Sequence, residues 1–83
     1  MKDLWIWEKH EHEKARGVLS WSVMIGDFRF IIAGSVTHPG SYFTMMLAHD
    51  DEGEPMSASI GGFAHSFADA DKMCREQYKR LQN

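Results

Sequence analysis

The sequence predicts an α+β fold, an antiparallel β-sheet meander of three to five strands with one C-terminal α-helix packed on one face. Three observations indicate it. Residues 18–36 alternate with a period of two, a proline-glycine turn follows them, and residues 66–81 carry the signals of a capped helix. Because the chain has only 83 residues, we expect one domain, residues 1–83, with a modest core.

The segment Val18–Val36 is predicted to be a β-hairpin. Gly26-Asp27 suits a two-residue turn with glycine first, which sets Ile25 opposite Phe28. The same register predicts three further pairs on one largely apolar face: Val23–Phe30, Trp21–Ile32 and Leu19–Gly34. The opposite face is then mixed in character and carries Ser20, Ser22, Met24, Arg29, Ile31, Ala33 and Ser35.

A third strand is expected from Ser41 to about His49. It follows Thr37-His38-Pro39-Gly40, where proline presets the first corner of a turn and glycine accepts positive φ. Whether the loop has two or four residues, the same residues of this strand face the same side of the sheet. This arrangement places three side chains on the apolar face, Phe43, Met45 and Leu47, and three on the mixed face, Tyr42, Thr44 and Met46.

The C-terminal half predicts one more strand and the helix. Met56–Ile60 could form a fourth strand that ends at Gly61-Gly62. Ser66 with Asp69 three residues later resembles a capping box and opens a helix from about Phe67 to Leu81. The side of the helix expected to face the sheet carries Phe67, Ala70, Cys74, Tyr78 and Leu81.

The N-terminal segment is ambiguous, because it is apolar at the consecutive positions Leu4–Trp7 and then strongly charged. The charged tail could continue a strand or turn helical, and we favour a strand through about Lys9. Trp5 and Trp7 either fold over the open sheet face and make the domain self-contained, or stay exposed and belong to an interface.

Several chemistries have no support in the sequence, so we expect no catalysis, no cofactor and no functional metal site. His10 and His12 would share one side of a strand and could hold a divalent ion, but no further ligands are predicted to converge on them. Cys74 is assigned to the core side of the helix, where a thiol is inert. Gly61-Gly62 lacks the spacing of a phosphate-binding loop and indicates a turn.

The compartment expected from these residues is a reducing cytoplasm. Cys74 is the single cysteine and cannot form an internal disulfide. No N-terminal secretion signal is evident, and the apolar runs are too short to span a bilayer, so we expect no membrane association.

Two surfaces are candidate binding sites. The first combines the acidic cluster Asp50, Asp51, Glu52 and Glu54 with the side chains Ile31, Tyr42 and Met46 of the mixed face. It would suit a protein partner with a basic surface, or a second copy of the chain docked on the open face. The alternative is nucleic-acid binding through the basic side of the helix, which carries Lys72, Arg75, Lys79 and Arg80.

The layout as a whole resembles small phage and mobile-element proteins, including anti-CRISPR inhibitors. The features that carry the resemblance are the size below one hundred residues, the net charge of −3, and a meander closed by one helix. The resemblance implies a non-enzymatic module that inhibits a host nucleoprotein complex by occupying its surface, in the host cytoplasm if the protein is phage-encoded.

Overall fold

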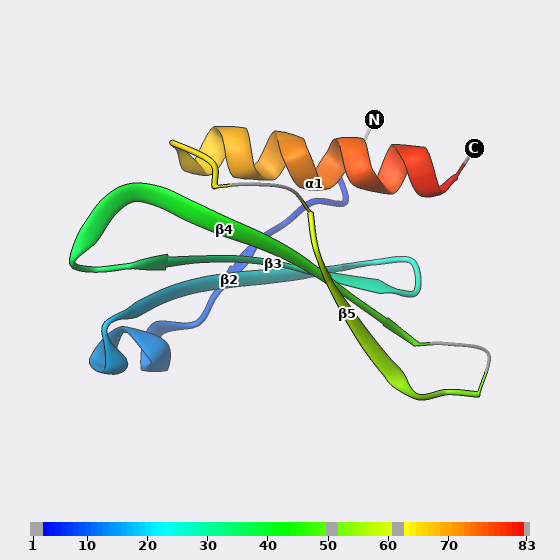
Figure 1. Cartoon of the computed structure of the whole chain (residues 1–83), viewed down its shortest axis with the longest axis horizontal. Coiled ribbons are helices and arrows are strands. Elements are labelled where there is room, and N and C mark those ends of the chain that lie inside the picture. Colours follow the sequence, from blue (N-terminus) through cyan, green and yellow to red (C-terminus); the bar gives the residue numbers. More distant parts are fainter. Residues whose placement is uncertain (1–2, 50–51, 61–62, 83) are drawn as a thin grey trace.

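The computed structural model describes residues 3–49, 52–60 and 63–82, and in them five strands form one antiparallel sheet in the order β1-β2-β3-β4-β5. Helix α1 lies across one face of this sheet (Figure 1). The predicted α+β meander with a C-terminal helix is therefore confirmed. The elements are β1 (Glu8–Lys9), the 3-10 helix η1 (Glu11–Arg16), β2 (Val18–Ile25), β3 (Phe28–Ser35), β4 (His38–His49), β5 (Pro55–Ser59) and α1 (Phe67–Leu81).

The β2–β3 hairpin has the predicted register. Ile25 pairs with Phe28 across Gly26-Asp27, and every predicted pair as far as Leu19–Gly34 is present. Gly26 has φ of 61°, whereas no described non-glycine residue has positive φ. This is the pattern of a turn with glycine at its first central position, where only glycine avoids steric cost. Local turn chemistry therefore determines the register of the hairpin.

The register between β3 and β4 differs from the prediction. Ser35 pairs with His38 across a two-residue turn, but Gly34 pairs with Tyr42, so three residues of β4 bulge out between the two pairs. Gly40, inside the bulge, has φ of 85° and needs the conformational freedom of glycine. An odd number of inserted residues reverses the faces of everything that follows, because side chains alternate with a period of two.

The predicted faces of β4 are consequently wrong. Its helix-facing side chains are Tyr42, Thr44 and Met46, which pair with Gly34, Ile32 and Phe30. Its outward-facing side chains are Phe43, Met45 and Leu47. Thr44 is fully buried, and Tyr42 and Met46 pack against the core. Tyr42 and Met46, expected on the open face, thus lie under α1.

The N-terminal segment crosses the edge of the core. Strand β1 ends at Lys9 as expected but is only two residues long, and the charged tail after it is the 3-10 helix η1. Trp5 packs against Phe30, with ring centroids 4.9 Å apart, and Trp7 packs against Phe67 at 5.9 Å. Both tryptophans therefore enlarge the core between helix and sheet. They belong to the core and not to an interface, as the first alternative has it, but they lie on the α1 side of the sheet and not over the open face.

Helix α1 begins and ends where the sequence predicts. Ser66 is its N-cap, and its Oγ accepts a hydrogen bond of 3.0 Å from the backbone N–H of Asp69. The fully or almost fully buried hydrophobic residues of the described chain are Ile25, Phe30, Ile32, Ala64, Ala70 and Cys74. Leu81 was expected in this core but is 43% exposed. Strand β5 starts one residue earlier than predicted, and Gly61-Gly62 lies outside the described residues.

Candidate functional site

The face of the sheet opposite α1 is the candidate site, and we call it the open face. The register places the following side chains on it: Met24 from β2, Arg29, Ile31 and Ala33 from β3, and Phe43, Met45 and Leu47 from β4. No helix or strand of the described chain packs across their centre, and α1 contacts the sheet from the other side. Of the residues predicted for this face, Ile31 lies on it, whereas Tyr42 and Met46 do not.

The open face is apolar along its middle and hollowed at both ends. Ile31, Met45 and Leu47 remain partly exposed, and Met24 is 54% exposed. One pocket of about 460 Å³ lies beside the β4 bulge, and a smaller one of about 270 Å³ lies beside the β2–β3 turn. The smaller pocket is lined by Met24, Asp27, Arg29, Leu47, Ala48, His49 and Pro55.

One margin of the open face is closed by polar contacts around β1 and η1. His10 Nε2 lies 2.6 Å from the hydroxyl oxygen of Ser22, which is 8% exposed. His10 is not in a strand and His12 is in η1, so the strand on which the expected spacing of the two histidines depends is not present there. Within residues 3–49, 52–60 and 63–82, no three His, Cys, Asp or Glu side chains are placed to hold a metal ion.

The acidic cluster lies between β4 and β5. Asp50 and Asp51 fall outside the described residues, whereas Glu52 and Glu54 are described and exposed. The strands that flank the cluster end at His49 and begin at Pro55, and both of these residues line the smaller pocket of the open face. Negative charge therefore borders one end of the open face.

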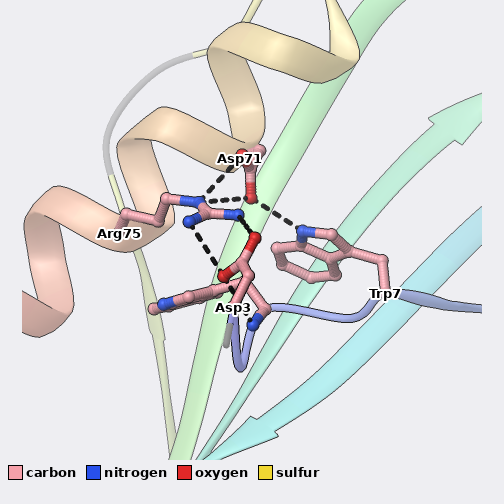
Figure 2. A network of polar contacts seen from close by, with 5 residues as sticks. Asp3, Trp7, Asp71 and Arg75 are labelled. Atoms are coloured by element: carbon pink, nitrogen blue, oxygen red, sulfur yellow. Dashed lines mark hydrogen bonds and ion pairs between the residues drawn. The ribbon is translucent and has the colours of Figure 1, made fainter. Parts of the chain in front are cut away.

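The basic side of α1 is not a free cationic surface at its centre. The Arg75 guanidinium donates to both Asp71 carboxylate oxygens through Nε, at 3.0 and 2.9 Å, and to Asp3 through Nη1 and Nη2, at 3.2 and 3.0 Å (Figure 2). Asp71 also accepts a bond of 2.8 Å from the indole N–H of Trp7. Lys72, Lys79 and Arg80 are exposed on the same helix.

This network attaches the N-terminal segment to α1. The hydrogen bonds from Arg75 and from the backbone N–H of Trp5 hold the pKa of Asp3 below its ordinary value of 3.8. The same contact, followed by the one with Asp71, raises the pKa of Arg75. The Arg75 guanidinium also lies over the Trp5 ring, 5.5 Å from its centroid. A structural role accounts for every one of these contacts.

Cys74 is buried in the core, as predicted. It is 0% exposed, and burial followed by the nearby Asp71 charge raises the pKa of its thiol to about 12. A nucleophilic cysteine requires the opposite conditions, namely exposure and a lowered pKa. The thiol therefore offers no reactive group at neutral pH.

Sequence reasoning missed Phe43, Met45 and Leu47 of the open face, together with Phe63, whose ring centroid lies 6.0 Å from that of Phe43. The signal that could have found them is Gly34, since glycine inside a strand often marks a bulge. A Cβ on Gly34 would lie 3.2 Å from Cδ1 of Tyr42, so a larger residue there would require the Tyr42 side chain to shift by a few tenths of an ångström.

Comparisons with known proteins identify no family for this chain. The chain matches no protein-family model, no curated protein and no solved structure. No helix in the described part of the chain is long and apolar enough to cross a membrane.

Proposed function

We propose that this protein is a non-enzymatic binding module that acts by docking the open face onto a protein partner. The observation that carries the proposal is the row of partly exposed apolar side chains, Ile31, Met45 and Leu47, on a sheet face that no described element covers. Contiguous apolar surface on a small domain costs free energy in water, and its usual explanation is a binding partner.

The composition of the open face supports binding to protein. Methionine, arginine and aromatic residues are enriched in interfaces, and this face carries Met24, Arg29, Phe43 and Met45. Methionine also adapts its shape to a partner because its side chain is flexible and polarizable. Hollows at both ends of the face would receive protruding side chains of a partner.

The finer proposal is that the partner has a basic surface, as a host nucleoprotein complex would, and that docking inhibits it. The acidic cluster that contains Glu52 and Glu54 adjoins the end of the open face, so apolar contact and electrostatic attraction would act on one partner. In this proposal the negative charge steers association, and the apolar side chains determine how long the complex lasts.

Affinity capture with matched variants tests the proposal. Tagged wild-type protein and the variants Met45→Glu and Ile6→Glu would be compared for the proteins that they retain from a lysate of the source organism. Ile6 is 70% exposed but lies in the N-terminal segment, so Ile6→Glu controls for added charge at an apolar surface position. We expect Met45→Glu to lose a protein that wild type and Ile6→Glu retain.

Two additional measurements make the result decisive. Circular dichroism should show the same folded spectrum for all three proteins, and sedimentation at several concentrations should reveal whether the retained partner is a second copy of the chain. Charge reversal at Glu52 and Glu54 should slow association and make it less sensitive to salt. If Met45→Glu is folded and retains the same proteins as wild type, the open face is not the docking surface.

A further inference from the structure

The larger of the two pockets of the open face lies beside the β4 bulge, and we call it the bulge pocket. Its volume is about 460 Å³, within the range of about 300 to 1,000 Å³ that is usual for pockets that enclose a ligand group. It is lined by Ala33, Gly34, Ser35, His38, Ser41, Phe43 and Phe63. No lining residue is an aspartate, a glutamate, a lysine or an arginine.

The bulge itself opens this pocket. Ser35 pairs with His38 and Gly34 with Tyr42, so the backbone of Pro39, Gly40 and Ser41 leaves the sheet where the next ladder pairs would be. The bulge also turns Phe43 outward, onto the same side as Ala33, with which it pairs. One backbone irregularity therefore borders the hollow and places Phe43 beside it.

Two phenylalanines form the apolar wall. The rings of Phe43 and Phe63 lie 6.0 Å apart between centroids and are tilted by 57°. Phe63 is 67% exposed although the next residue, Ala64, is buried. Aromatic pairs in this separation range accept a further ring at an edge or an offset face, so the wall is open to a third aromatic group.

A chain of hydrogen bonds forms the polar side of the pocket. Thr37 Oγ1 lies 2.8 Å from Ser35 Oγ and 3.0 Å from His38 Nδ1. The Thr37 backbone N–H also donates to Ser35 Oγ at 3.2 Å. Because Nδ1 of His38 is engaged by Thr37, Nε2 is the ring nitrogen left to bond a ligand. Among the described residues, Nε2 has no hydrogen-bond partner.

We propose that the bulge pocket receives a tryptophan or tyrosine side chain of the partner protein, with the ring against Phe43 and Phe63 and the indole N–H or phenol O–H at His38 Nε2. This rests on the proposed function, because the pocket is one end of the open face. A lining without ionic side chains favours a neutral group, and an aromatic wall beside the polar side chains of Ser35, His38 and Ser41 matches an aromatic ring with a polar end. Such a side chain would be the anchor of the interface.

Titration of the isotope-labelled protein with small probes tests the inference. The probes are N-acetyl-tryptophanamide, N-acetyl-tyrosinamide, N-acetyl-phenylalaninamide and N-acetyl-leucinamide, and amide chemical shifts report where each one binds. We expect the aromatic probes to shift the amides of Ala33, Gly34 and Phe43 and the leucine probe to shift none of them. Phe63→Ala should weaken binding of every aromatic probe by about five-fold, the size of one aromatic contact.

Matched variants separate the two parts of the site. His38→Ala should weaken the tryptophan and tyrosine probes several-fold and leave the phenylalanine probe unchanged, because only the first two have a hydrogen-bonding end. Ile6→Ala removes an equally exposed apolar side chain elsewhere and should change nothing. Equal shifts with the leucine probe, or shifts insensitive to Phe63→Ala, would overturn the inference.

Probe binding and partner capture, measured on the same variants, test the bulge pocket and the docking face separately. Met45→Glu lies outside the pocket lining, so this variant should lose partner capture and keep probe binding. Probe binding combined with Met45-independent capture would refute the docking face alone, whereas Met45-dependent capture without probe binding would refute the pocket alone. Free indole binding more tightly than N-acetyl-tryptophanamide would identify the pocket as a small-molecule site and overturn its role as an anchor site.

Discussion

The two faces of the sheet are built by the same strands but differ in what covers them. On the α1 side, Phe30 and Ile32 are 0% exposed, and Trp5, Trp7 and Tyr78 pack against them or their neighbours. On the open face, Phe43 and Met45 come from alternate positions of β4 and remain partly exposed. Alternation of side chains places one apolar set under the helix and a second apolar set on a face that no element in the described part of the chain covers.

This difference indicates that hydrophobicity alone does not define the core of a small sheet protein. The covered face is closed by α1 and by the N-terminal segment, which is attached through Trp7, Asp71 and Arg75 (Figure 2). Side chains there contribute to stability because their burial removes apolar area from water. Side chains of the open face contribute less to folding and are available for binding.

Truncating one phenylalanine on each face should give the largest difference between the two faces in the free energy of unfolding. Phe30→Ala should lower the free energy of unfolding by about 3–5 kcal/mol, since Phe30 is fully buried and contacts the rings of Trp5 and Tyr78. Phe43→Ala should cost only about 1 kcal/mol because the side chain is partly exposed. Urea denaturation followed by circular dichroism measures both values.

A small domain has little stability to lose, so Phe30→Ala could be unfolded before denaturant is added. Ile32→Val then provides the milder comparison, with an expected cost of about 1 kcal/mol at a site that is also 0% exposed. Equal costs for Phe30→Ala and Phe43→Ala would mean that the open face is covered in solution, for instance by a second copy of the chain.

The reactivity of Cys74 tests how firmly α1 closes the covered face. In the native protein, a thiol reagent at about pH 8 should react on the order of 100-fold more slowly than in urea-unfolded chain, because the thiol is 0% exposed and its pKa is raised to about 12. The raised pKa favours folding below the ordinary thiol value of 9.0, and this contribution is lost as the pH rises toward 12. Similar reaction rates in the native and unfolded protein would show that α1 opens freely.

Replacing a buried polar group on the α1 side of the sheet should stabilise the protein. The hydroxyl of Thr44 is fully buried, and its Oγ1 has no hydrogen-bond partner among the described residues. Thr44→Val keeps the shape and removes the unpaired hydroxyl, so we expect about 1 kcal/mol of added stability in the same urea experiment. Thr37→Val is the control, because that hydroxyl is exposed and bonded to Ser35 and His38, and its loss should stabilise nothing.

The parts of the fold that could be predicted from sequence depend on neighbouring residues. Gly26-Asp27 determines the hairpin register and Ser66 with Asp69 determines where α1 begins, because both are local turn or capping signals. The faces of β4 could not be predicted in this way. A bulge of three residues reverses them, and the close approach of Tyr42 to Gly34 beside it exists only in the folded sheet.

The same distinction holds for the candidate site. Ile31 was placed correctly because it belongs to the locally determined hairpin, whereas Tyr42 and Met46 were misplaced because they follow the bulge. The pairing of Arg75 with Asp3 joins residues 72 positions apart, so no spacing rule along α1 could have indicated that this cation is occupied. Whether the open face binds a partner stays a prediction.

The smallest expected effect concerns the ion pair that attaches the N-terminal segment to the covered face. The pKa of Asp3 is lowered by Arg75, so its contribution to stability is present above the ordinary value of 3.8 and is lost as the pH falls through the lower value of the folded state. Asp3→Asn should therefore lower Tm slightly at about pH 6, and the difference should shrink as the pH falls through the lowered pKa of the folded state. Asp27→Asn changes an exposed acid in the hairpin turn and should show no such pH-dependent difference.

Salt at about 1 M should reduce the Tm difference between Asp3→Asn and wild type at neutral pH, because both Asp3 and Arg75 are partly exposed. A Tm difference that persisted unchanged in acid would mean that the charge of Asp3 does not cause the effect, and would remove the ion pair from the contacts that close the covered face.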